Sequence, residues 1–301
     1  MRALVRPGTD SDWLERLGVE VVPGDVTDAD GYGAAAYGAE RVFHVAGMVA
    51  FLPEMRTLME SVNVGGVKNA VRAARDGGAK TLVVTSSVAA VGGGKGEVDE
   101  THPWHGDDRL GYASTKRAGE DLALGAAGKK MRIVAVNPAI VLGPEDPRRS
   151  TGGDYLIRAA TGRIPVAVNM LQGFVDARDC AEGHILAAEK GRSGERYILC
   201  QSSVPMAEFL TLCRTAAGNP GRVWRIPWWF LPPLALLAEW WADRRHEPPQ
   251  VTREQARMAR RQAAFSSAKA RKELGWKPRP LTATIRDSVE WFQKDGMLEN
   301  S

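Results

Sequence analysis

The chain has 301 residues, of which 44% are hydrophobic and 25% are charged, and its formal net charge is +4. This composition is that of a globular protein and excludes a disordered chain. The small net charge and the lack of an arginine-rich arm argue against a nucleic-acid-binding protein. No apolar stretch reaches the roughly 18 residues of a membrane span. Three cysteines form no Cys-x-x-Cys pair, so we expect a cytoplasmic protein without disulfides.

Short β-branched runs alternate with helical stretches over about the first 140 residues, which is typical of a parallel sheet covered by helices. The runs are rich in Val, Leu or Ile, as strands buried on both faces require. The predicted strands are Ala3 to Arg6, Glu20 to Val22, Arg41 to Val45, Thr81 to Thr85 and Arg132 to Val136. We therefore expect an α/β fold with a doubly wound parallel sheet.

The longest predicted helix runs from Glu54 to Asp76 and ends at Gly77-Gly78, where a left-handed cap costs little. Asn63 lies among its apolar residues and needs a hydrogen-bond partner if it is buried. Beyond residue 145 the alternation loosens. We expect residues 1–145 to form a dinucleotide-binding domain, to which the chain returns with a strand and a helix near 173–190. Residues 146–301 are expected to form mainly a smaller substrate lobe that is discontinuous in sequence.

Three polar side chains suited to proton transfer follow these strands and helices. Ser87 ends the run Thr85-Ser86-Ser87, and Tyr112-Ala-Ser-Thr-Lys116 follows later in the chain. If Tyr112 opens a helix, Lys116 projects from the same face one turn on. The nearby ammonium is expected to lower the pKa of the phenol, so that Tyr112 acts as a general acid and base while Ser87 holds the substrate oxygen.

Several motifs together resemble the extended short-chain dehydrogenase/reductases. They are Gly24-Asp-Val-Thr-Asp28, Val42-Phe-His-Val-Ala-Gly47, Asn63-Val-Gly-Gly66, Thr85-Ser-Ser87, Tyr112 to Lys116, Asn137-Pro-Ala-Ile-Val-Leu-Gly-Pro144 and Ser267 to Trp276. The chain is most similar to the dihydroflavonol-reductase-like and hopanoid-associated epimerase/dehydratase groups. The resemblance implies a Rossmann-like fold.

The same resemblance implies roles for individual residues. Ser87, Tyr112 and Lys116 are implied to be catalytic, and Asn63 to steady the active-site backbone or a proton-carrying water. Asp25 and Val26 are placed beside the adenine, and Ala46 and Gly47 near the ribose and pyrophosphate. Pro138 and Ile140 are placed near the nicotinamide. The full set implied to bind cofactor is Arg6, Asp25, Val26, Val45, Ala46, Gly47, Thr85, Tyr112, Lys116, Pro138 and Ile140.

The family pattern begins with a strand and a Gly-x-x-Gly-x-x-Gly turn that receives the pyrophosphate. None of the 32 glycines forms that turn. The missing strand is central in the sheet order 3-2-1-4-5-6, so its neighbours would lack ladder partners. We expect the first β–α unit to be absent from this chain and the true start of translation to lie upstream of Met1.

Arg6 bears on the choice of cofactor. Enzymes of this fold that use NAD place an acidic residue at the end of the second strand, whereas NADP users place an arginine nearby. The strand ends Val5-Arg6-Pro7, which favours NADP over NAD. The alternative is that Arg6 is an exposed residue of a turn.

The segment 227–241 is unusually rich in tryptophan. It suits either a lid or membrane-surface contact helped by the basic stretch Arg253 to Arg261, or helices that pack in the small lobe or at a dimer contact. His102 and His105 lack a third ligand at suitable spacing, so no metal site is predicted.

Three functions compete. The first is an NAD(P)-dependent reductase or dehydrogenase acting on a CH–OH or C=O group of a small, apolar substrate. The second is a nucleotide-sugar epimerase or dehydratase, and the third is a non-catalytic nucleotide-sensing or scaffold protein. By resemblance, a homodimer is expected through the helices 54–76 and 112–127, with a small-molecule substrate and no nucleic acid as partners.

Overall fold

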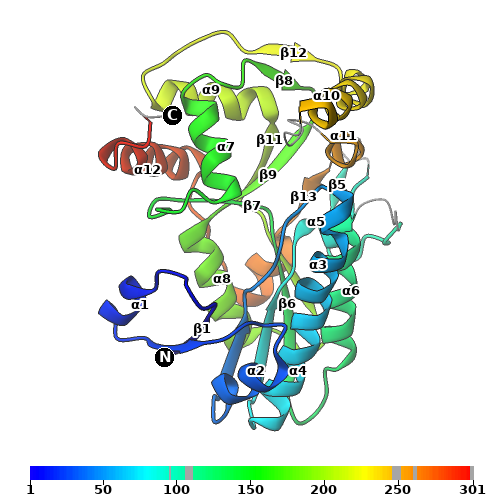
Figure 1. The fold of residues 1–301 in the computed structure, drawn as a ribbon, viewed down its shortest axis with the longest axis vertical. Helices are drawn as coiled ribbons and strands as arrows, with labels where there is room; N and C mark the ends of the chain where they lie inside the picture. The colour runs from blue at the N-terminus through cyan, green and yellow to red at the C-terminus, as the bar shows by residue number, and fades with distance from the viewer. Residues whose placement is uncertain (95, 106–110, 246–251, 260–262, 299–301) are drawn as a thin grey trace. The chain divides into compact units, whose positions relative to one another are not determined.

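The structure is a computed structural model that describes residues 1–94, 96–105, 111–245, 252–259 and 263–298 (Figure 1). The chain divides into two compact units. Unit 1 comprises residues 1–90, 106–137 and 184–197, and unit 2 comprises residues 91–105, 138–183 and 198–301. Each unit is described by itself.

Unit 1 contains the predicted parallel strands. β1 (Arg2–Val5) pairs in parallel with β2 (Glu20–Pro23) in a two-stranded sheet. A four-stranded sheet has the order β10-β6-β4-β3, and its strands are β10 (Arg196–Leu199), β6 (Arg132–Pro138), β4 (Thr81–Thr85) and β3 (Arg41–His44). β4 pairs in parallel with both β3 and β6. All five strands expected in this part of the sequence are therefore present.

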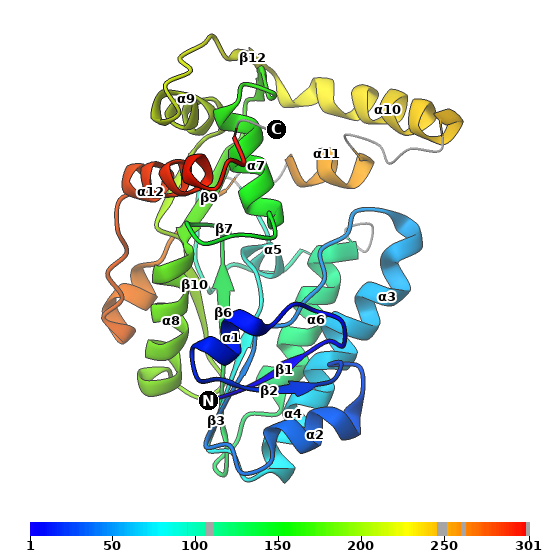
Figure 2. The same cartoon turned by 60° about the vertical axis from the view of Figure 1, so that its left-hand side comes forward.

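Three helices cover the strands of unit 1: α2 (Ala29–Ala36), α4 (Gly66–Asp76) and α6 (Gly111–Gly125). Apolar residues of α4 pack with residues of β4 and β6 in one buried core that includes Val67, Ala70, Leu82 and Ile133. α4 and α6 lie side by side (Figures 1 and 2). Their packing brings the N-terminal turns of α6 toward the carboxyl end of β4.

The helix predicted over residues 54–76 is continuous but not uniform. It begins with η1 (Pro53–Met55) and α3 (Arg56–Glu60), passes through a π-helical turn, η2 (Ser61–Gly65), and continues as α4. Gly78 has the predicted left-handed backbone, with φ of 80°. π-Turns within α-helices are frequent at functional positions, and Asn63 lies in this one.

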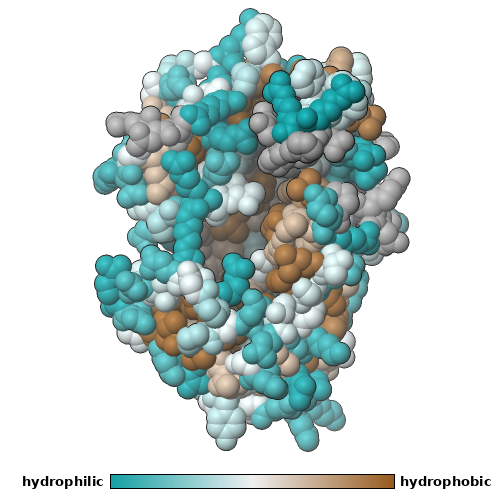
Figure 3. Space-filling model, in the orientation of Figure 1, coloured by the Kyte–Doolittle hydropathy of each residue, from teal (hydrophilic) through white to brown (hydrophobic). Residues whose placement is uncertain are grey.

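The interruption expected in the sheet is confirmed. Among the described residues, β1 pairs with β2 and β3 pairs with β4, but no ladder joins β1 to β3. Phe43 and Val45 at the edge of the four-stranded sheet are exposed, as are Trp13 and Leu17 near the two-stranded sheet. Hydrophobic surface shows over the β1–β2 segment at the lower left of Figure 3.

Unit 2 is built around a three-stranded sheet of order β11-β9-β7, with strands β7 (Ile140–Leu142), β9 (Leu171–Asp176) and β11 (Ser202–Pro205). Residues of α7 (Thr151–Ala160), α9 (Met206–Ala216) and α12 (Leu281–Lys294) share its core, in which Phe174 stacks on Phe209 at a centroid distance of 4.3 Å.

Smaller elements complete the two units. Two short parallel ladders join β12 (Trp224–Ile226) to β8 (Val166–Val168) and β13 (Ala264–Phe265) to β5 (Glu97–Val98). The remaining elements are α1 (Asp12–Arg16), α5 (Val88–Val91), α8 (Ala177–Lys190), η3 (Trp228–Phe230), α10 (Leu231–Arg245), α11 (Arg253–Ala259) and η4 (Ala270–Leu274).

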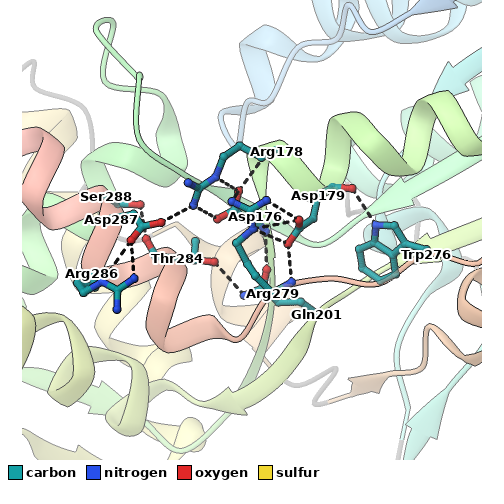
Figure 4. A network of polar contacts seen from close by, with 10 residues as sticks. All are labelled: Asp176, Arg178, Asp179, Gln201, Trp276, Arg279, Thr284, Arg286, Asp287 and Ser288. Atoms are coloured by element: carbon teal, nitrogen blue, oxygen red, sulfur yellow. Dashed lines mark hydrogen bonds and ion pairs between the residues drawn. The ribbon is translucent and has the colours of Figure 1, made fainter.

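An ion-pair network built on the buried carboxylates of Asp176 and Asp179 fixes the turn from β9 into α8 (Figure 4). The Asp176 carboxylate accepts hydrogen bonds from the backbone N–H and the Nε of Arg178, both at 2.9 Å, and thereby caps α8. Asp179 accepts from Nε of Arg279 at 3.0 Å, and its carbonyl accepts from the Trp276 indole at 2.8 Å. These contacts give Asp176 and Asp179 a structural role at the start of α8.

Candidate active site

β4 and α6 carry the three residues that the sequence singled out for proton transfer. β4 is almost wholly buried, and the chain emerges from it through Ser86 and Ser87. α6 begins at Gly111, so Tyr112 occupies its first turn and Lys116 lies one turn later. Tyr112 and Lys116 therefore lie one turn apart on the same described helix.

The Tyr112 phenol lies against Ser87. A hydrogen bond between the two hydroxyl groups acts to lower the pKa of Tyr112, but burial acts more strongly in the opposite direction and raises it. Phe51 meets the Tyr112 ring edge-on at a centroid distance of 6.3 Å. The expectation of a lowered tyrosine pKa is thus wrong for this structure, because removal of the phenolate from water outweighs the favourable contacts.

Lys116 is buried, with 7% of its surface exposed. Its Nζ donates a hydrogen bond to the carbonyl oxygen of Thr85 at 2.6 Å, which ties α6 to the last residue of β4. Burial lowers the pKa of Lys116 to about 8, although the negative charge of Glu120 opposes this shift. The ammonium is therefore fixed in position and close to its titration range at neutral pH.

Asn63 finds the partners that a buried carboxamide requires. Its Oδ1 accepts from the Met48 backbone N–H at 2.8 Å, and its Nδ2 donates to the Met48 carbonyl at 2.9 Å and to Thr115 Oγ1 at 3.1 Å. These bonds fix the loop after β3. A Cβ placed on Gly47 in that loop would lie 3.4 Å from both Asn63 Oδ1 and Lys116 Nζ. Asn63 thus steadies the backbone at this site, one of the two roles considered for it.

A buried network behind Lys116 was missed by the sequence analysis. Glu120 Oε2 accepts from Asn137 Nδ2 at 2.5 Å, and Glu120 Oε1 pairs with Arg196 Nε at 2.9 Å. Asn137 Nδ2 also donates to the carbonyl of Ser87 at 3.0 Å. Glu120 lies one helical turn after Lys116, and this spacing could have indicated that Glu120 belongs to the network. Arg196 lies far away in sequence, and no local pattern connects it.

The residues assigned to the adenosine side follow β1 and β2. Arg6 is exposed directly after β1, and its charge contributes to a lowered pKa for Asp25. The larger causes of that shift are hydrogen bonds from the Thr27 backbone and hydroxyl to the Asp25 carboxylate. The carbonyl of Val26 accepts from Asn69 Nδ2 at 2.9 Å. The charge of Arg6 therefore acts on Asp25, the other residue assigned to the adenosine side.

The residues assigned to the other side of the cofactor follow β3 and β4. Val45, Ala46 and Gly47 come directly after β3, and Val45 and Gly47 are exposed. Thr85 ends β4, where its hydroxyl bonds with His184 Nε2 at 2.8 Å and its carbonyl is held by Lys116. Carboxyl ends of parallel strands form the binding edge in this class of sheet.

Two further assigned residues belong to unit 2. Pro138 is the last residue of β6, and Ile140 is the first residue of β7. The structure brings together Ser87, Tyr112, Lys116, Asn63 and Gly47 in unit 1, and it does not place Pro138 or Ile140 relative to them.

His44 also lies in unit 1 but is not available as a base. Its Nδ1 bonds with the Tyr32 hydroxyl at 3.0 Å, and burial, with a smaller effect from the Lys116 charge, lowers its pKa to about 4. It is neutral at pH 7.

Comparison with known proteins identifies the family. The model of the 3-beta hydroxysteroid dehydrogenase/isomerase family matches residues 5–209. Sterol demethylase protein B of Methylococcus capsulatus is 31% identical over 306 residues, which cover 99% of this chain and 92% of that protein. A Synechocystis sp. protein provisionally named dihydroflavonol 4-reductase is 31% identical over 310 residues, covering 99% and 89%.

A solved structure agrees with these relatives. The crystal structure described as gox2253 superposes with a TM-score of 0.86 at 33% identity, and the match covers 99% of this chain and 91% of that one. The expected Rossmann-like fold is confirmed. The chain belongs to the 3-beta hydroxysteroid dehydrogenase/isomerase family of extended short-chain dehydrogenase/reductases, and it is an NAD(P)-dependent oxidoreductase.

Proposed function

We propose that the protein reduces a ketone on an apolar substrate, and in reverse oxidises the secondary alcohol, with Tyr112 as general acid and base. The observation that carries this proposal is the hydrogen bond between the Ser87 and Tyr112 hydroxyls, one helical turn from an ammonium fixed on the Thr85 carbonyl. Such a set can polarise a carbonyl oxygen and deliver a proton to it.

The raised pKa of Tyr112 suits the reductive direction. Because burial favours the neutral phenol, Tyr112 holds its proton at neutral pH and can donate it to the oxygen of a ketone. Ser87 supplies a second hydroxyl donor to the same oxygen. When Tyr112 has given up its proton, the Lys116 ammonium on the same helix face stabilises the phenolate.

The chain's own residues fit a nicotinamide dinucleotide at two places. Arg6 and Asp25 would hold the adenosine side, and Ala46 with the exposed Gly47 would approach the ribose and pyrophosphate near Lys116. The bound nicotinamide supplies the hydride in the reduction. The sequence contains no Gly-x-x-Gly-x-x-Gly turn that would bind the pyrophosphate through its backbone N–H groups.

The substrate class rests on the relatives. The family description names 3-beta hydroxysteroids, and a relative at 31% identity is named for sterol demethylation. Both names support a substrate that carries a hydroxyl or keto group on an apolar ring system. The neighbours described as nucleotide-sugar epimerases, such as one from Pseudomonas aeruginosa at 22% identity, support the shared fold but not a sugar substrate.

Replacement of Tyr112 by phenylalanine tests the proposal. The Tyr112→Phe variant should lose about 100- to 10,000-fold in kcat for reduction of a 3-ketosteroid with NADPH, because the proton donor is removed. Binding of NADPH, followed by tryptophan fluorescence, should be preserved. The control is Tyr37→Phe, at a tyrosine that is 75% exposed. Undiminished turnover by Tyr112→Phe, or turnover of UDP-glucose in place of the steroid, would contradict the proposal.

Arg6 should set a preference for NADPH over NADH. A guanidinium at this position can form charge-assisted hydrogen bonds with the 2′-phosphate, worth about 10- to 100-fold in binding. We expect Arg6→Gln to reduce the ratio of kcat/KM for NADPH over NADH by that factor, while Arg16→Gln leaves it unchanged. A ratio that does not respond to Arg6→Gln would leave Arg6 as an exposed turn residue.

The lowered pKa of Lys116 predicts how stability depends on pH. The pKa of Lys116 is about 8 in the folded chain, whereas the ordinary value is 10.5. Between these two pH values the unfolded chain binds more protons at this residue than the folded chain does. The contribution of Lys116 to the free energy of unfolding therefore rises with pH across this window and is constant below it. Between pH 8 and pH 10, the free energy of unfolding of the wild type should rise by about 1–3 kcal/mol relative to that of Lys116→Met.

Urea denaturation at several pH values measures this difference. Lys129→Met, which changes an exposed lysine, is the control and should show no such slope. A difference between wild type and Lys116→Met that stays constant from pH 7 to pH 10 would show that the folded pKa of Lys116 is not lowered.

Glu120 should act as a positioning residue. Glu120→Gln removes the negative charge that supports the Lys116 ammonium and weakens the bonds to Asn137 and Arg196. We expect kcat to fall about 10-fold with KM nearly unchanged, because a small displacement of Lys116 slows the reaction without removing a substrate contact. The upper pH limit of activity should move to lower pH. Asp76→Asn, at an exposed acidic residue of α4, is the control. A pH profile that does not move would refute the coupling to Lys116.

A further inference from the structure

The strongest feature of unit 2 outside the family motifs is an exposed apolar surface on η3 and α10. We call it the α10 face and define it by the side chains that are between 45% and 56% exposed: Trp229, Phe230, Leu234, Leu236, Leu237, Trp240 and Trp241. These seven residues fall on successive turns, so they form one continuous strip. Large exposed apolar strips mark sites of interaction in stable proteins.

The opposite side of α10 accounts for its packing within unit 2. Leu231 and Ala235 are buried in a cluster with Ala256 and Ala259 of α11 and with Val168. Figure 2 shows α11 along one side of α10. The helix is therefore apolar on both sides, and its contacts within unit 2 leave the α10 face uncovered among the described residues.

The exposed charges that the structure describes around the α10 face are positive. Between residues 222 and 245, the exposed charged side chains that the structure describes are Arg222, Arg225, Arg244 and Arg245. Arg244 lies 3.7 Å over the Trp240 ring and Arg245 lies 4.8 Å over the Trp241 ring. The carboxylate of Glu239 is paired with Arg253 at 2.5 Å. Arg260 and Arg261 of the predicted basic stretch lie outside the described residues.

From these observations we propose that the α10 face lies in the headgroup region of an anionic lipid membrane. The apolar strip enters the acyl boundary, the tryptophans occupy the interface, and the arginines at the end of the helix remain with the anionic headgroups. The exposed arginines complement such a surface. No described helix has the length and hydropathy needed to cross a bilayer, which agrees with a helix that lies on it.

Vesicle binding by the intact protein tests this proposal. The protein should sediment with vesicles of phosphatidylcholine and phosphatidylglycerol, bind pure phosphatidylcholine vesicles more weakly, and be released by added salt. The variant Trp240→Ala/Trp241→Ala should reduce the partition coefficient at least 10-fold. Trp13→Ala, at an exposed tryptophan of unit 1, is the matched control and should bind as the wild type does.

A second variant keeps the test decisive if the tryptophan variant folds poorly. Arg244→Gln/Arg245→Gln changes exposed side chains only and should reduce binding to anionic vesicles by about 25-fold, while binding to neutral vesicles stays the same. Failure of the wild type to bind anionic vesicles would overturn the proposal. Binding that neither variant weakens would also overturn it, as would a concentration-dependent dimer that the variants dissociate, because the face would then be a contact between copies of the chain.

Discussion

The hydrogen bond from Lys116 Nζ to the Thr85 carbonyl is the constraint on which the arrangement of the site depends. It is 2.6 Å long and joins the first turns of α6 to the end of β4. Ser87 lies two residues beyond that carbonyl, and Tyr112 lies one turn before the lysine. A single buried ammonium thereby fixes the relative positions of the two hydroxyl groups that would meet a substrate oxygen.

This constraint is costly and needs support from its surroundings. A buried lysine loses hydration, which disfavours its charged form, and the nearby carboxylate of Glu120 offsets part of that cost. Glu120 is itself buried and is held by Asn137 and Arg196, while Asn137 also binds the Ser87 carbonyl. The strand end, the helix and the hydroxyl pair are thus linked through one polar network.

Much of this site could be predicted from the sequence. The strands of unit 1 and the helix that opens at Tyr112 follow from local patterns of apolar residues, and Ser87, Tyr112 and Lys116 follow from motifs at the ends of those elements. The roles of Glu120 and Arg196 could not be predicted, because residues 120, 137 and 196 meet only after the sheet forms. The direction of the Tyr112 pKa shift was predicted wrongly, because the degree of burial is a property of the folded chain.

A double-mutant cycle on Ser87 and Tyr112 tests the central claim most directly. The claim is that one fixed arrangement makes the two hydroxyls act as a unit. Single-turnover rates of 3-ketosteroid reduction would be measured for wild type, Ser87→Ala, Tyr112→Phe and the double variant. If the account is correct, the double variant will be no slower than the slower single variant, because each change disables the same unit. Losses that multiply in the double variant would contradict the account.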